Sequence, residues 1–269
     1  MTKELNTYLP VNSYDGVNPS CLRDRLMRRP VVEHIERYRW VLNDLRSRGA
    51  DAWPLLEVGT GCGWGLKQIQ TYFDELSVGI DLDISALSEG IQAGVRKVSQ
   101  ANLVAQNLPF VDEQFGTIVN LNLLEQLSDP LTGLINMNRV AKRNAQMYIS
   151  IFNRDLFSPG GIKWFKPNEH EFSQNDLVKL LSESGWCAVE WLGQRFVSRK
   201  AYLKRATQLQ SIENWLKKSE VLSKDRRVQI FRARVQNIIP SSNPSVAVKR
   251  LEERPSMEPV IITARCIKN

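Results

Sequence analysis

Between residues 54 and 152, short apolar segments alternate with longer segments whose apolar residues recur every three or four positions. The short segments predict strands and the longer ones predict helices. The strands are expected at residues 54–58, 77–80, 102–105, 117–121 and 146–152, and the helices at 64–73, 84–95 and 131–142. Because strand–helix–strand crossovers join parallel neighbours, this order predicts a mostly parallel sheet with helices on both faces.

The flanking sequence predicts further elements. Pro30 suits a first helical position, and the pattern after it predicts a helix to Arg48 that Gly49 ends. Ser173 is expected to cap a later helix, and strands are expected at 186–192 and 260–264. Two more helices are expected between 203 and 238. We therefore divide the chain into an N-terminal segment with a lid helix (1–50), a core (51–198), a basic helical insertion (199–240) and a C-terminal strand completing the sheet (241–269).

Composition excludes several classes of protein. No apolar run in the 269 residues approaches the ~20 needed to span a bilayer, and the polar first residues lack a signal peptide's apolar stretch. Four cysteines lie far apart and only two histidines are present, so we expect no metal site. The composition predicts a cytoplasmic protein that does not use a membrane.

Positive charge is concentrated in one segment. Residues 195–239 hold twelve Lys or Arg and three acidic residues, a net charge of +9 against +7 for the whole chain. This segment is either a solvated helical face, a surface for an acidic small acceptor, or a surface for RNA. No RNA-binding signature accompanies it, so we favour the first two over nucleic acid.

A glycine-rich turn follows the first predicted strand of the core, in the segment LLEVGTGCGWG. Gly59, Gly61 and Gly63 allow a tight turn that a ligand can approach closely. Asp81 ends the next strand, 18 residues after Gly63, which is the distance at which an acid accepts ribose hydroxyls in this architecture. The two features together predict a site for a nucleoside cofactor.

The spacing separates this turn from two other phosphate- or nucleotide-binding motifs. A dinucleotide fingerprint would need glycine where Trp64 or Leu66 stands, and no G-K-[ST] follows for a P-loop. The pattern E-x-G-x-G-x-G instead suits S-adenosylmethionine (SAM), whose cationic amino group Glu57 could address through water or backbone.

Several segments in order resemble the class I SAM-dependent methyltransferases, in particular members that modify small molecules and glycans. LLEVGTGCGWG resembles the first motif, VGIDLD the ribose motif, and QNLPFVDEQFGTIVNLNLLEQLSDP the block from the adenine loop through the fourth strand. EHIERYRW is similar to a lid helix, and HEFSQNDLVKLLSESGW to a later helix and strand. The resemblance covers about 31–194 and implies a Rossmann-like fold with seven mostly parallel strands, the last antiparallel, and a helical insertion.

The resemblance implies SAM as cofactor and methyl transfer to an oxygen or nitrogen of a small molecule or glycan. The residues expected to bind SAM are Tyr38, Glu57, Gly59, Thr60, Gly61, Gly63, Asp81, Leu82, Gln106, Asn107, Leu108 and Asn122. His170 follows the fifth strand and is the candidate general base; it could equally be a solvated or helix-capping histidine.

Some positions depart from the family's pattern. Val104 stands where an acid often meets adenine, Gly116 and Gln126 replace an Asp and a His, and residues 142–144 replace Pro-Gly-Gly. These departures keep a non-catalytic SAM-binding scaffold open, as the basic insertion keeps an RNA methyltransferase open. The acceptor and the oligomeric state do not follow from the sequence.

Overall fold

The computed structural model describes residues 22–73, 75–102, 108–157, 170–200, 207, 211, 248–253 and 257–268. Its α-helices are α1 (Leu22–Arg48), α2 (Trp64–Tyr72), α3 (Ile84–Gln92), α4 (Pro130–Val140), α5 (Arg154–Phe157) and α6 (Gln174–Glu183). Its strands are β1 (Leu55–Val58), β2 (Ser77–Asp81), β3 (Val98–Gln100), β4 (Phe115–Leu121), β5 (Ala141–Phe152), β6 (Trp186–Val197), β7 (Lys249–Arg250) and β8 (Glu258–Lys268). Short 3-10 helices are η2 (Gly49–Ala52), η3 (Leu124–Gln126) and η5 (Leu251–Glu253). Of the two helices expected at 203–238, only Thr207 and Ser211 are described, and both are helical; the rest lies outside the described residues.

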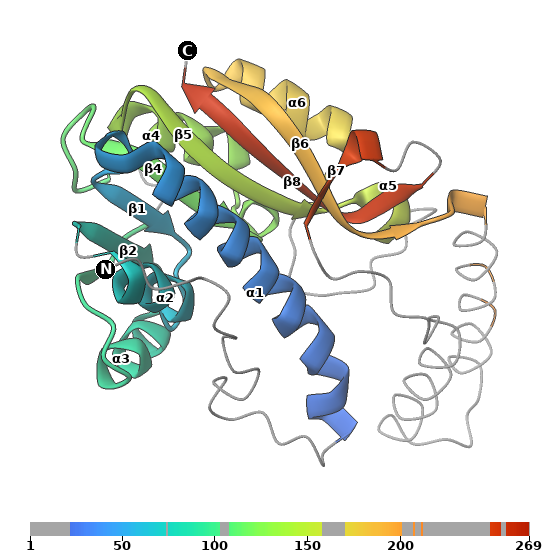
Figure 1. The fold of residues 1–269 in the computed structure, drawn as a ribbon, viewed down its shortest axis with the longest axis horizontal. Coiled ribbons are helices and arrows are strands. Elements are labelled where there is room, and N and C mark those ends of the chain that lie inside the picture. Colours follow the sequence, from blue (N-terminus) through green and yellow to red (C-terminus); the bar gives the residue numbers. More distant parts are fainter. Residues whose placement is uncertain are drawn as a thin grey trace.

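The described strands form one sheet in the order β3-β2-β1-β4-β5-β8-β6-β7 (Figure 1). From β3 to β5 every pairing is parallel, as the alternating pattern predicts. β8 lies between β5 and β6 and runs antiparallel to both, which confirms the antiparallel last strand. The sheet has eight strands instead of the expected seven, because the two-residue β7 pairs with the outer edge of β6.

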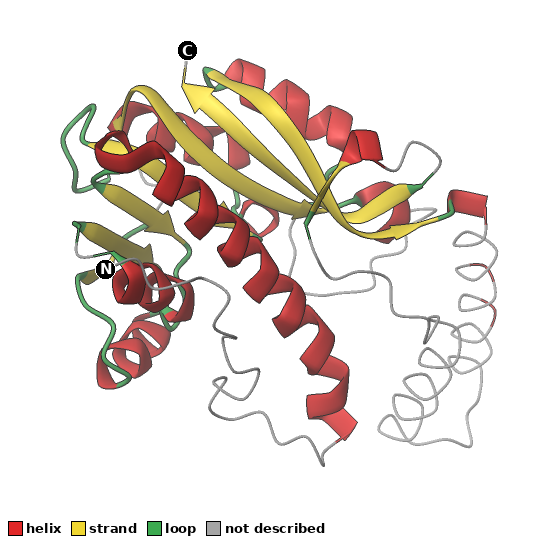
Figure 2. Cartoon of the chain, viewed as in Figure 1, coloured by secondary structure: helices red, strands yellow, loops and turns green. Residues whose placement is uncertain are grey.

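Helices cover both faces of the sheet (Figure 2). On one face, α1 and α2 share an apolar cluster with β1, β4 and β5, to which Leu42 and Leu66 contribute. On the other face, α4 and α6 pack through Leu134, Met137 and Leu177. The resulting three-layer arrangement is the Rossmann-like fold expected from the sequence.

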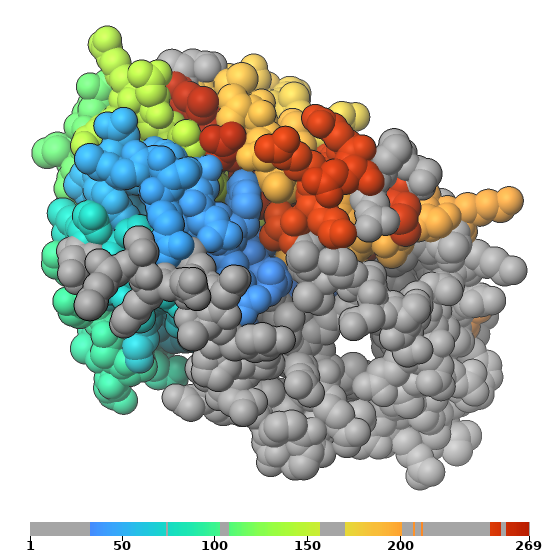
Figure 3. Space-filling model, viewed as in Figure 1, coloured from blue at the N-terminus to red at the C-terminus, as the bar shows by residue number. Residues whose placement is uncertain are grey.

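Helix α1 runs diagonally across one face of the sheet and ends beside β1 and β4 (Figure 1). Its described part, in blue, lies at the surface of the molecule (Figure 3). The Tyr148 hydroxyl on β5 donates a hydrogen bond to Asp44, and Trp40 meets the Tyr148 ring edge-on with centroids 5.1 Å apart. The helix begins at Leu22, so the predicted start at Pro30 is wrong. The residues before Pro30 are mostly Leu, Met and Arg, which are strong helix formers and continue the helix on its N-terminal side.

Three other boundaries differ from the sequence prediction. The structure has a strand at Val98–Gln100 that the sequence analysis missed, because an edge strand with one partner can be polar and shows no apolar run. Of the strand expected at 102–105, only Asn102 is described, and it lies outside a strand. α3 ends at Gln92 because Gly94 adopts a left-handed φ of +86° just beyond it. α4 ends at Val140, and Lys142 lies in β5 instead of the helix.

One departure from the family pattern has a structural cause. A Cβ atom at Gly116 would lie 2.4 Å from the carbonyl oxygen of Asp51, so β4 can approach η2 only with glycine there.

Within the described ranges, no helix is both long and apolar enough to cross a membrane.

Candidate active site

The glycine loop joins β1 to α2 at the carboxyl end of β1. Gly59, Gly61 and Gly63 adopt left-handed φ values of +70°, +55° and +69°, which explains the alternating glycines. A Cβ atom at Gly59 would lie 2.8 Å from Leu123, whereas one at Gly61 would meet nothing within 4 Å. The loop is therefore packed at its start and open at Gly61, where a ligand can approach the backbone.

Glu57 is buried on β1 directly beneath this loop. Its carboxylate accepts hydrogen bonds from the Tyr38 hydroxyl and, at 2.5 Å, from Thr60 Oγ1. Burial raises the pKa of Glu57 to about 7, although these hydrogen bonds act in the opposite direction. The structure thus places three predicted residues, Tyr38, Glu57 and Thr60, in one buried contact.

Asp81 ends β2 beside the glycine loop, because Val58 and Ile80 are paired in the sheet. Its Oδ2 accepts a hydrogen bond from Gly61 N at 2.7 Å, and its Oδ1 accepts one from Asp83 N at 2.9 Å. The adjacent Leu82 is 64% exposed, an apolar surface next to the carboxylate. The predicted ribose acid and the glycine loop therefore form one structural unit.

Tyr38 reaches this unit from α1. A Cβ atom at Gly65 would lie 1.9 Å from Tyr38 Cζ, so the ring lies directly over the first turn of α2. Trp64 and His34 meet the Tyr38 ring edge-on, with centroids 5.7 and 5.0 Å away. The N-terminal helix thus packs over the start of α2; that it acts as a lid stays a prediction.

Asn122 directly follows β4 in a left-handed conformation, with φ of +61°. Its Oδ1 accepts hydrogen bonds from Arg37 Nη2 at 2.6 Å and from Ser150 Oγ at 3.2 Å. Arg37 also donates from Nη1 to Gln194 Oε1 at 2.6 Å, so it links α1, β4 and β6.

The sequence analysis missed Arg37. A signal was present, because Arg37 interrupts the buried stripe formed by Tyr38, Val41 and Leu45 at helical spacing. A charged residue on such a stripe requires partners inside the fold. Two of those partners, Asn122 after β4 and Gln194 on β6, lie far along the chain, and no local pattern could identify them.

His170, the expected general base, lies at the rim of the same edge of the sheet. Its backbone N–H donates to the Glu125 carbonyl at 3.0 Å, its Nε2 lies 3.3 Å from the Ser128 carbonyl, and its ring stacks on Phe172. These contacts connect it to the start of α4 and not to the glycine loop. Its catalytic role stays a prediction.

The remaining predicted residues belong to the adenine loop. Gln106 and Asn107 lie outside the described residues. Leu108 is buried in the core, and its carbonyl accepts hydrogen bonds from Phe110 N at 2.7 Å and Arg139 Nη2 at 3.1 Å. The Leu108 side chain and carbonyl are therefore engaged in the fold.

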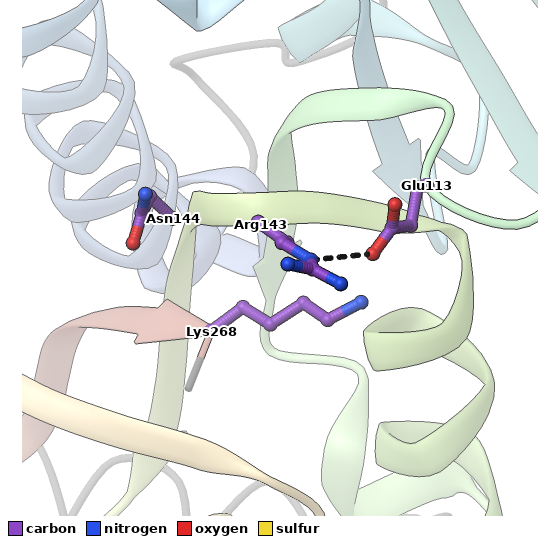
Figure 4. Close-up of a pocket in the computed structure, with 4 residues that line it drawn as sticks. All are labelled: Glu113, Arg143, Asn144 and Lys268. Carbon is purple, nitrogen blue, oxygen red and sulfur yellow. Dashed lines mark ion pairs between the residues drawn. The ribbon is translucent and has the colours of Figure 1, made fainter.

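A separate pocket lies at the opposite edge of the sheet, lined by Glu113, Arg143, Asn144 and Lys268 (Figure 4). Arg143 and Glu113 form a 3.5 Å ion pair there, with side chains that are 88% and 52% exposed. Ligands of open parallel sheets bind at the carboxyl ends of the strands, and this pocket adjoins the amino ends of β4 and β5. We do not assign a ligand to it.

The residues around the glycine loop fit S-adenosylmethionine. The open space at Gly61, the carboxylate of Asp81, the buried acid Glu57 and the exposed Leu82 match a ribose, an amino group and an apolar base. The match rests on the chemistry of these groups, and no phosphate-binding cation stands in the loop.

Comparisons with known proteins agree with this geometry. Residues 56–149 match the family model of a methyltransferase domain. A probable S-adenosylmethionine-dependent methyltransferase of Mycobacterium tuberculosis is 29% identical over 141 residues, which are 52% of this chain and 50% of that protein. An O-methyltransferase of Aspergillus nomiae is 28% identical over 162 residues, 54% of this chain and 68% of that protein. The chain thus spans about half the length of the mycobacterial relative.

A solved structure from Thermotoga maritima has the same fold. It is a SAM-dependent methyltransferase described as a possible histamine N-methyltransferase. The two chains share 15% sequence identity, and the superposition covers 92% of this chain and 96% of that chain with a TM-score of 0.56. Residues 56–149 are thus identified as a methyltransferase domain similar to those of S-adenosylmethionine-dependent methyltransferases, the described fold is that of such enzymes of known structure, and S-adenosylmethionine is the cosubstrate that such a domain uses.

Proposed function

We propose that this protein transfers the methyl group of SAM to an oxygen or nitrogen atom of a small molecule or glycan. The observation that carries the proposal is the unit formed by Gly61 and Asp81 at the ends of adjacent strands, with Glu57 buried beneath it. The methyltransferase-domain match over 56–149 supports it.

In this proposal, each residue of the unit has a role in holding SAM. Asp81 accepts the ribose hydroxyls, which compete with its present hydrogen bond from Gly61 N. The ionised form of Glu57 supplies negative charge for the amino group, and Leu82 offers apolar surface to the adenine. Bound SAM supplies an activated methyl group, so the protein must mainly hold the acceptor in line with it and exclude water.

The nature of the acceptor atom is supported by less direct evidence. An O-methyltransferase among the relatives supports an oxygen acceptor, for which His170 would serve as general base. Most of the basic insertion, on which the RNA alternative depends, lies outside the described residues.

The test is thermal unfolding with and without S-adenosylhomocysteine, using the parent, Gly61→Arg and Asp81→Ala. Ligand at a hundred times its dissociation constant should stabilise the parent by about 2.7 kcal/mol. Both substitutions should abolish the rise in midpoint, because one fills the open space and the other removes the ribose partner. No rise in the parent at millimolar ligand would overturn the proposal.

A second measurement separates an enzyme from a SAM-binding scaffold. Parent protein that binds S-adenosylhomocysteine should convert SAM into S-adenosylhomocysteine when it is supplied with a library of acceptors. Binding without any conversion of SAM would leave the scaffold as the function.

A further inference from the structure

Three buried polar atoms on neighbouring elements have no hydrogen-bond partner. They are Arg37 Nε on α1, Asn122 Nδ2 after β4, and Glu125 Oε2 in η3. Arg37 and Glu125 are only 3% and 2% exposed. Buried polar groups are nearly always paired, and three orphaned atoms in one region indicate a missing partner.

The three residues are held together by the fold. Arg37 Nη2 donates to Asn122 Oδ1 at 2.6 Å, and the Arg37 charge acts on the Glu125 carboxyl. Glu125 Oε1 is fixed by a 2.7 Å hydrogen bond from Phe152 N at the end of β5. One oxygen of Glu125 is therefore anchored to the sheet while the other has no partner.

The electrostatics of this cluster favour an anion. The hydrogen-bond partners of Arg37 in the described part of the chain are Gln194, His34 and Asn122, and all three are neutral there. His34 is neutral because burial and Arg37 lower its pKa to about 3. The nearby acid Glu33 is paired with Arg195 on β6, with Nε and Oε1 2.9 Å apart.

Glu125 does not neutralise Arg37 through a hydrogen bond. Burial raises the pKa of Glu125 to about 7, so a large share of the carboxyl is protonated at neutral pH. Glu33 and the ionised form of Glu125 act on the Arg37 charge from nearby, and a bound anion would add a counter-charge that is hydrogen-bonded to the guanidinium.

The position of the cluster assigns the anion to the acceptor side of the site. The SAM-binding unit lies at the ends of β1 and β2, whereas the cluster lies at the ends of β4 and β5, with β1 next to β4 in the sheet. The two regions adjoin, because Tyr38 follows Arg37 and contacts Glu57, and Leu123 follows Asn122 and packs against Gly59.

We propose that Arg37, Asn122 and Glu125 bind a carboxylate of the methyl acceptor. Arg37 Nε–H and Asn122 Nδ2–H donate to the carboxylate oxygens, and the protonated form of Glu125 donates from Oε2. All three orphaned atoms thereby gain a partner, and the charge of Arg37 is balanced. This inference rests on the proposed function and narrows its substrate class to small molecules that carry a carboxylate.

The test uses the full chain saturated with S-adenosylhomocysteine, so that an effect on carboxylate binding can be distinguished from an effect on cofactor binding. Thermal unfolding midpoints are measured with acetate, pyruvate and benzoate, each paired with its neutral amide. At least one carboxylate should raise the midpoint more than its amide does. Arg37→Met should weaken that carboxylate about tenfold or more, as expected for removal of a buried charged partner.

Three further variants sharpen the result. Arg39→Met is the matched control, since Arg39 is on the same helix but pairs with Glu36 at the surface, and it should leave binding unchanged. Asn122→Asp places a second carboxylate in the site and should abolish binding of the carboxylate ligand. This variant tests the site if Arg37→Met does not fold. Glu125→Gln should retain binding, because its amide still donates a hydrogen bond to an anion.

Several outcomes would overturn the proposal while leaving the proposed function intact. One is that no carboxylate exceeds its amide although S-adenosylhomocysteine still stabilises the protein. Another is that Arg37→Met weakens S-adenosylhomocysteine itself, which would assign the cluster to the carboxylate of the cofactor. A third is that Glu125→Gln abolishes binding, which would indicate an ionised Glu125 that accepts from a hydroxyl group.

Discussion

Glu57 should make the protein less stable as pH rises, and Glu57→Gln should remove this effect. The pKa of the folded carboxyl is about 7 and its ordinary value is 4.5, with burial as the main cause. An acid whose pKa is raised by folding stabilises the fold below its unfolded value and loses that contribution as pH rises through the folded value. For these two values the loss between pH 5 and pH 8 is about 2.5 kcal/mol.

The assay is urea unfolding of the parent and Glu57→Gln at pH 5, 6, 7 and 8, followed by circular dichroism. The difference in free energy of unfolding, variant minus parent, should increase by about 2.5 kcal/mol over this range. Glu125 has a similar raised pKa, but it is present in both proteins and cancels in the difference. Glu89→Gln removes an exposed carboxylate of α3 and controls for loss of one surface charge. A difference that stays flat from pH 5 to pH 8 would refute the argument from burial.

Two further changes test the packing around the site. Gly65→Ala should destabilise the parent by about 1–3 kcal/mol, because its Cβ would overlap the Tyr38 ring. In a Tyr38→Ala background the same substitution should destabilise the protein much less. Equal losses in both backgrounds, measured by urea unfolding, would contradict this contact. Ser173→Ala should cost about 1 kcal/mol, or a midpoint about 2–4 °C lower by calorimetry, because Ser173 and Asp176 form a capping box at the start of α6. A Ser173→Ala midpoint equal to that of the parent would show that the cap does not stabilise the helix.

The sequence predicts the parts of the fold whose signals are local. The glycine loop, Asp81 and the cap of α6 all follow from residues within a few positions of each other. The parallel core strands flanked by helices follow from the alternation of two periodicities. Gly61 and Asp81 are brought together because they follow neighbouring strands, which the crossover rule implies.

The parts that could not be predicted depend on distant contacts or weak patterns. β3 and β7 are short edge strands with polar residues, so neither has an apolar run. Arg37 on α1 hydrogen-bonds to Asn122 after β4 and to Gln194 on β6, which lies 157 positions away in sequence. Such a cluster becomes visible only when the elements are packed.

The antiparallel β8 has a consequence for how this chain folds during synthesis. β8 is the strand that bonds β5 to β6, for example by pairing Ser150 and Leu192 with Thr263. Until residues 258–268 leave the ribosome, the edges of β5 and β6 therefore lack this partner and expose unpaired backbone groups. Such long-range pairing forms slowly, and an incomplete sheet with unpaired edges is the stage at which a chain of this topology is most exposed to aggregation.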